Sequence, residues 1–251
     1  MKKLFILLSL VSFIHAVGLN TYQLQVLQDI AIVSDKYKDK IKEDLKPILL
    51  SIYYLESSAG INILGDRYTK TGKVNTIYES SLGAGQIQLR TAQIVLNKYP
   101  YLAKRYSYLI HPNIYSYNEY VKVLKNIDKF KRIINNPRWN TSKTTKGLNT
   151  MSWANKELIK NKEIFSAKYE NDSKIDDLLL NKLLRDHKFS AIISIHYLIM
   201  NYEEAQKRKK PLVFSAISKY NGGWNNTTYF NKVKNIKEKI IEPLIRKGII
   251  R

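Results

Sequence analysis

The segment YYLESSAGIN, residues 53–62, places one glutamate, Glu56, at the end of an apolar run and follows it with serine, alanine and glycine. The apolar residues before it recur at i, i+3 and i+4, the spacing that brings side chains onto one face of an α-helix. These positions are Leu49, Ile52 and Tyr53. Glu56 continues the same stripe, so we expect it to face the core or a cleft.

The predicted ends of this helix put the glutamate in its last turn. Pro47 suits the first turn, where a missing N–H costs little, and Gly60 suits the position just past the end. Burial and the negative end of the helix dipole both disfavour a charged carboxylate, so we expect a raised pKa for Glu56. A carboxylic acid that stays protonated near neutral pH can protonate a leaving oxygen, as glycosidases require. The alternative is a glutamate that merely reaches solvent at a helix end.

Helical periodicity continues through most of the chain, and the fold class that it predicts is all-α. Apolar residues recur at helical spacing over residues 24–32, 120–134, 179–197 and 236–244. The pattern breaks where Gly, Asn, Ser or Thr are dense, at 57–75, 135–150 and 220–228. We predict one domain, with its core at residues 45–93 and 185–245 and a helical insertion at about 95–185.

The N-terminal residues are typical of a secretory signal. Lys2 and Lys3 precede an apolar run from Leu4 to Ile14, and Ala16 offers a small residue for cleavage. We therefore predict a signal peptide at residues 1–16 and an exported, periplasmic chain. The chain has no cysteine, which excludes disulfides and thiolate chemistry. Its histidines are few and scattered, so we expect no metal and no other cofactor.

The 251-residue chain has a formal net charge of +21, which favours polyanionic surroundings. The lysines are spread over the polar sides of the predicted helices, where a solvated surface is the simplest interpretation. Export and the absence of a recognisable binding motif argue against a nucleic-acid partner. We expect a monomer.

Two further segments fall in order behind the first: GAGQIQLRTA at 83–92 and SKYNGGWNN at 218–226. Together with Leu-Glu-Ser-Ser at 55–58, they resemble the transglycosylase domain of the soluble lytic transglycosylase (SLT) family. The resemblance covers residues 45–93 and 185–226. The residues that match the family's motifs are Glu56, Ser57, Gln86, Tyr197, Tyr220 and Asn221.

The resemblance implies a lysozyme-like helical fold, of the goose-type lysozyme and SLT kind, and action on peptidoglycan glycan strands. Glu56 would be the catalytic acid and then the base in cleavage of the β-1,4 bond between N-acetylmuramic acid and N-acetylglucosamine, leaving a 1,6-anhydro end. No second carboxylate and no metal is required. Substrate-binding roles are implied for Ser57, Gln86, Tyr197, Tyr220 and Asn221. For Gln86 the alternative is a helix N-terminal residue that bonds the backbone, and for Tyr197 it is core packing.

Two other functions stay open at this point. A hydrolysing muramidase would need a second carboxylate as base, and Asp66 and Glu79 are the candidates. A non-catalytic glycan-binding wall protein would keep the fold without the reaction. The insertion, with Trp139 and Trp153, is a candidate docking surface for the cell wall or for a secretion complex, unless its helices simply pack on the core.

Overall fold

The computed structural model describes residues 18–38, 44–65, 80–111, 117–141 and 143–251. The described residues form helices, which confirms the all-α prediction. The extended pairings of the described residues are limited to isolated bridges that join Leu82 with Leu64 and with Ile87. None of the helices described here has the length and apolar character to cross a membrane. The predicted signal peptide at 1–16 and the candidate bases Asp66 and Glu79 lie outside the described residues.

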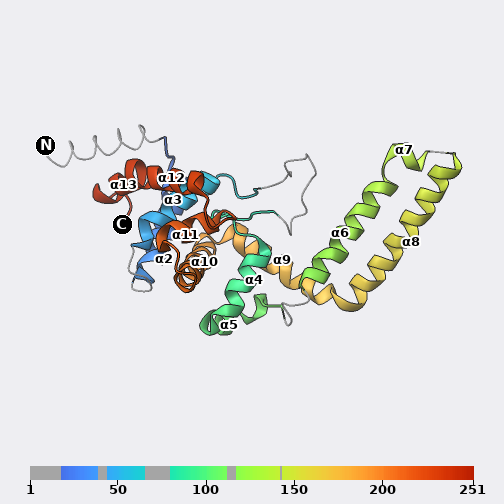
Figure 1. Ribbon diagram of the computed structural model, residues 1–251, viewed down its shortest axis with the longest axis horizontal. Coiled ribbons are helices and arrows are strands. Elements are labelled where there is room, and N and C mark those ends of the chain that lie inside the picture. The colour runs from blue at the N-terminus through green and yellow to red at the C-terminus, as the bar shows by residue number, and fades with distance from the viewer. Residues whose placement is uncertain (1–17, 39–43, 66–79, 112–116, 142) are drawn as a thin grey trace. The chain divides into compact units, whose positions relative to one another are not determined.

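The helices follow one another along the chain as Figure 1 labels them. They are α2 (Thr21–Asp35), α3 (Leu45–Ser57), α4 (Leu89–Lys98), α5 (Pro100–Arg105), η2 (Ser107–Leu109), α6 (Tyr117–Ile134), α7 (Pro137–Asn140), α8 (Thr145–Lys168), α9 (Glu170–Arg185), α10 (His187–Lys207), α11 (Leu212–Tyr220), α12 (Thr227–Ile236), η4 (Lys237–Ile241) and α13 (Glu242–Arg246). They divide into two compact units: residues 1–99 with 180–251, and residues 100–179. The sequence prediction put the ends of an insertion near 95 and 185.

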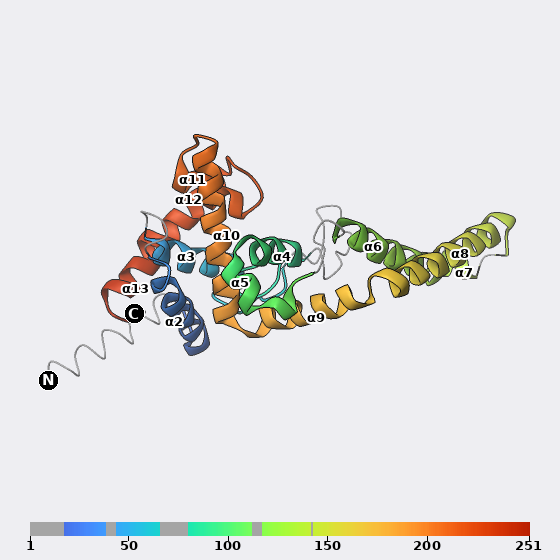
Figure 2. The same ribbon diagram turned by 90° about the horizontal axis from the view of Figure 1, so that it is seen from below.

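Helices α3 and α10 form the core of the first unit. In α3 the stripe of Leu49, Ile52 and Tyr53 has no exposed surface, as its spacing predicts. Helix α10 is buried on every side over most of its length, which is typical of a central helix. It contacts α2, α3, α4 and α11, and Figure 2 shows it between these neighbours.

The ends of α3 differ in part from those predicted. Asp44 caps the first turn by accepting a hydrogen bond from the Lys46 N–H at 3.0 Å, and Pro47 lies in that turn. The helix ends earlier than expected, because Ser58 already has a left-handed backbone with φ of 51°. Gly60 is the third residue of this left-handed stretch rather than the cap itself. The short, sharp turn leaves Glu56 in the last helical turn.

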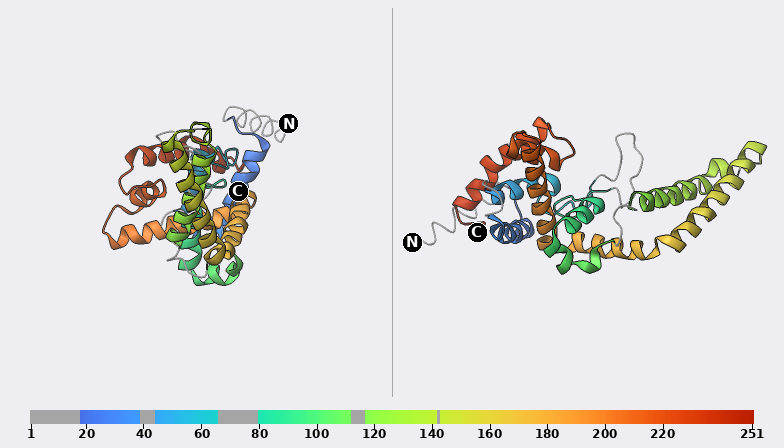
Figure 3. Two further views of the ribbon diagram at one scale, coloured as in Figure 1. Left: turned by 90° about the vertical axis from the view of Figure 1, so that its right-hand side faces the viewer. Right: turned by 60° about the horizontal axis from the view of Figure 1, so that its bottom comes forward.

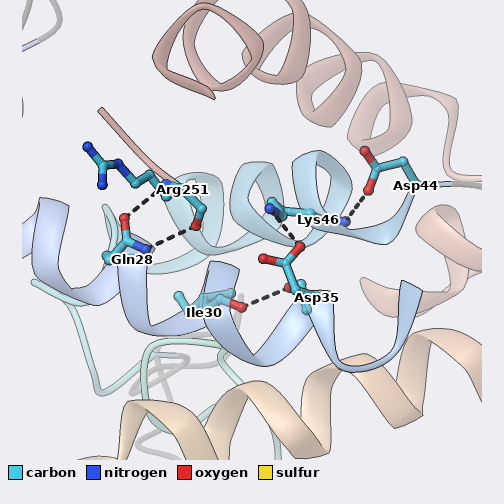
Figure 4. Close-up of polar contacts among 7 residues, drawn as sticks. Gln28, Ile30, Asp35, Asp44, Lys46 and Arg251 are labelled. Atoms are coloured by element: carbon cyan, nitrogen blue, oxygen red, sulfur yellow. Dashed lines mark hydrogen bonds and ion pairs between the residues drawn. The ribbon is translucent and has the colours of Figure 1, made fainter. Parts of the chain in front are cut away.

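Polar contacts tie α2 to α3 and to the end of the chain (Figure 4). The Lys46 ammonium lies 2.6 Å from Asp35 at the end of α2. The side chain of Gln28 donates to the carbonyl oxygen of Arg251 and accepts from its N–H, both at 3.0 Å. These contacts are exposed, so each contributes little beyond fixing the geometry.

The second unit is built on the antiparallel pair of α6 and α8, joined through α7 (Figure 3). Helix α6 packs through the large side chains predicted for it, among them Tyr120, Ile127 and Phe130. Helix α8 packs through small or polar residues seven apart: Gly147, Ala154 and Asn161. Its apolar pattern is therefore weak, and helical periodicity does not predict it.

The predicted break at 135–150 is wrong in part, because its turn residues are helix-start signals. Asn136 caps α7 by accepting from the Arg138 N–H at 2.9 Å, and Pro137 is the first residue of that helix. Thr144 caps α8 by accepting from the Gly147 N–H at 3.2 Å. Asn, Pro and Thr all favour the first positions of a helix as well as loops.

A buried polar cluster fixes α9 to the loop before α6. His111 Nε2 lies 2.8 Å from Asp176 Oδ1, and His111 Nδ1 lies 3.5 Å from Asp172 Oδ1. The Tyr117 hydroxyl donates to the other oxygen of Asp176 at 3.4 Å. His111 and Asp176 are essentially inaccessible to water, so each depends on the other for a partner.

We expect His111→Ala to lower the free energy of unfolding of the second unit by about 3 kcal/mol, because the buried Asp176 loses its main partner. Trp139 and Trp153 both lie in this unit, so tryptophan fluorescence during urea unfolding would report it. His187→Ala is the matched control: that histidine makes an exposed bond to Tyr22, and its loss should cost under about 1 kcal/mol. Equal effects of the two substitutions would contradict the prediction.

Candidate functional site

A cleft of about 590 Å³ opens in the first unit at the end of α3. Its walls come from the segment before α4, the middle of α10 and the turn after α11. The lining residues are Glu56, Gly65, Ser81, Gln86, Ile87, Gln88, Thr91, Tyr197, Tyr220, Asn221 and Gly222. Five of the six residues singled out in the sequence meet here, and Ser57 is the exception.

Glu56 projects from the last turn of α3 into the cleft and is half-buried. Among the described residues of the lining it is the sole carboxylate. The side-chain amide of Asn221 donates to its Oε1 at 3.5 Å, and Asn226 in turn donates to Asn221 Oδ1 at 3.3 Å. The turn after α11 thus presents a neutral donor to the carboxylate.

Tyr229, on the first turn of α12, is buried near Glu56 and was missed in the sequence. Burial raises the pKa of its hydroxyl, and the negative charge of Glu56 raises that pKa further. The hydroxyl therefore stays protonated and neutral at any physiological pH. No feature of the segment NNTTYF distinguishes this tyrosine from the other 17 in the chain, because only the packing of α12 against α3 brings it to the site.

Ser57 is a structural residue here, which corrects the expected substrate contact. It has no exposed surface. Its hydroxyl donates to the carbonyl oxygen of Ala84 at 2.7 Å and accepts from the N–H of Gly60 at 2.8 Å. Ser57 therefore joins the end of α3 to the segment that forms the opposite wall, and no surface of it is left for a sugar.

The backbone N–H and carbonyl oxygen of Gly85 are held by a closed ring of hydroxyl groups. Its N–H donates to Ser190 Oγ at 3.4 Å, and its carbonyl oxygen accepts from the Tyr220 hydroxyl at 2.8 Å. The Tyr53 hydroxyl links the two sides, at 3.1 Å from Ser190 Oγ and 3.0 Å from Ser194 Oγ. Ser194 Oγ lies 3.0 Å from the Tyr220 hydroxyl and closes the ring. Because each hydroxyl both donates and accepts, every member of this buried ring can be satisfied.

This ring leaves no room for a side chain at position 85. A Cβ there would lie 2.3 Å from Ser194 Oγ and 2.7 Å from the Tyr53 hydroxyl. Two serines four residues apart, both fully buried among the apolar residues of α10, are the sequence signal that could have revealed the ring. Most buried residues of α10 are apolar, so helical periodicity alone does not single out the two serines.

Gln86 shapes the wall of the cleft. It has a left-handed backbone, with φ of 52°. Its amide nitrogen donates to the carbonyl oxygens of Asn62 at 2.8 Å and Gly83 at 2.9 Å. It does bond the backbone, yet not from a helix N-terminus, because the N-cap of α4 is Gln88. A side chain at Gly65 would collide with the Gln86 oxygen, so the glycine and the amide fit each other.

The two tyrosines of the cleft pack together, with ring centroids 5.4 Å apart. Tyr197 is half-buried and lines the cleft, so core packing alone does not describe it. Its hydroxyl donates to the carbonyl oxygen of Lys219 at 3.4 Å. Burial raises the pKa of both Tyr197 and Tyr220. The cleft therefore combines one carboxyl group with amides and neutral phenols.

Comparison of the chain with protein families, with characterised proteins and with solved structures found no match in any of the three.

We expect Gly85→Ala to lower the free energy of unfolding by about 3 kcal/mol, because the methyl group displaces two hydroxyls of the buried ring. Gly223→Ala is the control: a Cβ at Gly223 meets nothing within 4 Å. Chemical unfolding followed by circular dichroism would measure both. Similar stabilities for the two variants would show that the ring does not constrain the segment.

Stability should also fall as the pH rises above about 10, the ordinary tyrosine pKa. Burial raises the pKa of Tyr53 and Tyr220 in the folded state, so the unfolded chain releases their protons first and is favoured at high pH. Tyr220→Phe should reduce the slope of unfolding free energy against pH by about 1 kcal/mol per unit between pH 10 and 11. A Tyr220→Phe slope equal to that of the wild type would refute the assignment.

Proposed function

We propose that the chain is a peptidoglycan lytic transglycosylase whose first unit has a lysozyme-like fold of the goose-type and SLT kind. The observation that carries the proposal is the position of Glu56. One carboxyl group, in the last turn of a buried helix, enters a cleft otherwise lined, among the described residues, by neutral groups. The order of the three sequence segments supports the same family. An exported chain would meet this substrate in the periplasm.

In this proposal Glu56 acts twice. It first donates its proton to the glycosidic oxygen between N-acetylmuramic acid and N-acetylglucosamine, and the C1–O bond breaks. The acetamido group of the muramic acid stabilises the positive charge that develops at C1. The Glu56 carboxylate then takes the proton of the C6 hydroxyl as that oxygen bonds to C1. The proton balance closes without water or metal, and the product carries a 1,6-anhydro ring.

The neighbours of Glu56 suit this double role. Asn221 donates to the carboxylate without adding charge, so it can orient both the acid and the base form. Tyr229 and Tyr220 stay neutral, because burial raises the pKa of each. Tyr197 offers an aromatic ring on the wall of the cleft for a pyranose ring.

The decisive experiment is mass spectrometry of the fragments that the chain from Val17 releases from purified peptidoglycan. We expect products ending in 1,6-anhydromuramic acid, one water lighter than reducing ends. Glu56→Gln should abolish release, since it removes the proton donor, typically a loss of at least about a hundredfold. Glu238→Gln, which changes an exposed carboxylate on η4, is the control and should retain activity.

Each other outcome would point to a different function or mechanism. Reducing ends in place of anhydro ends would mean hydrolysis and a base beyond Glu56, with Asp66 and Glu79 to be substituted next. No release by the wild type, together with retention of the glycan strands, would mean a binding protein. Release by Glu56→Gln at the wild-type rate would remove Glu56 from the mechanism.

A further inference from the structure

Helix α8 of the second unit exposes large apolar side chains on its outer side. Leu148, Trp153 and Ile159 are 59%, 47% and 58% exposed. Leu148 and Ile159 are eleven residues apart, about 16 Å along the helix and three full turns, so they lie on the same side. The side that packs against α6 is the opposite one, carried by Gly147, Ala154 and Asn161. Leu148 and Ile159 therefore point away from α6, while Trp153 contacts α6 at one edge only.

Basic side chains surround these apolar residues. On α8 they are Lys146, Lys156 and Lys160, which share the side of Trp153 by their helical spacing. From the neighbouring helix α6, the Lys129 ammonium reaches the Trp153 ring. We call these four lysines, with Leu148, Trp153 and Ile159, the basic-apolar face.

Lys129 and Phe130 connect the two helices across this face. The Lys129 ammonium lies 5.7 Å from the centre of the Trp153 ring, and the edge of that ring packs on Phe130 at 5.2 Å. The carboxylates that α8 adds nearby are Glu157, which is half-buried, and Glu163. Positive charge therefore dominates the face around the tryptophan.

We propose that the basic-apolar face binds the surface of an anionic lipid bilayer. Tryptophan favours the interface between headgroups and acyl chains, and lysine stems can extend along apolar surface while the ammonium contacts phosphate. Exposed leucine and isoleucine add apolar area that a phosphate backbone or an acidic protein would not bury. Lys129 already covers part of the Trp153 ring, which restricts stacking by a base or a sugar. Lipid thus fits the combination of groups better than nucleic acid.

The test is sedimentation of the chain from Val17, which contains every described residue, with vesicles of phosphatidylcholine alone or with phosphatidylglycerol. We expect binding to the anionic vesicles that weakens with salt, and none to the neutral ones. Binding that ignores lipid charge, or no binding at low salt, would overturn the proposal. Binding to single-stranded DNA or to peptidoglycan in place of vesicles would also overturn it and identify a different polyanion.

Two matched pairs of variants locate the site. Neutralising three cations of the face, Lys129, Lys156 and Lys160, to Gln should weaken binding by about a hundredfold. The control neutralises three exposed lysines of the first unit, Lys207, Lys232 and Lys239, to Gln with the same change in net charge. Equal losses in the two would mean that overall charge, and not this face, attracts lipid.

The apolar part is tested separately with Leu148→Ser and Ile159→Ser together. Both side chains are more exposed than buried, so the helix should keep its fold, which circular dichroism would verify. We expect about tenfold weaker binding, mostly in the part that resists salt. The control pair, Ile32→Ser and Ile94→Ser, changes exposed isoleucines of the first unit. Unchanged binding by the Leu148 and Ile159 variant would refute insertion of this face.

Discussion

The hydroxyl ring around Gly85 is the constraint on which the candidate site depends. Through it α3, α10 and the end of α11 hold the two peptide groups that flank the Gly85 Cα, at distances of 2.8–3.4 Å. The ring is buried, so none of its members has water as an alternative partner, and losing any one leaves the others unsatisfied. Ser57 adds a second bond to the same segment, at Ala84. The wall that faces Glu56 is therefore fixed from two sides.

Neutral polar groups suit this position better than ion pairs would. A buried charge in the ring would carry a desolvation penalty and would alter the proton affinity of the nearby carboxyl group. Hydroxyls satisfy the peptide and add no net charge, and the raised pKa of Tyr220 keeps it neutral. In the proposed reaction, Glu56 must gain and lose a proton within one turnover, so a neutral frame around it is an advantage.

The two units have different surface chemistry. In the first, the cleft combines one carboxyl group with amides and phenols. In the second, α6 and α8 bury large residues against small ones and leave a basic and apolar outer side. In the two proposals, the cleft takes a polysaccharide and the outer side of α8 takes an anionic bilayer. The two proposed sites share no residues.

Apolar residues that recur at 3.6-residue spacing predict most of the helices, α3 above all, and the side of α3 that carries Glu56. Periodicity could not identify α8, because small residues form its packing side. Nor could it separate Gln86, Tyr197 and Asn221, which reach the cleft, from Ser57, which is buried beneath it. It also missed Tyr229 and the serines of α10. Those outcomes were decided by tertiary structure alone, because hydrogen bonds such as Gly85 to Ser190 join residues about a hundred positions apart. Local spacing specifies which face of a helix is apolar, but not which distant polar group will meet it.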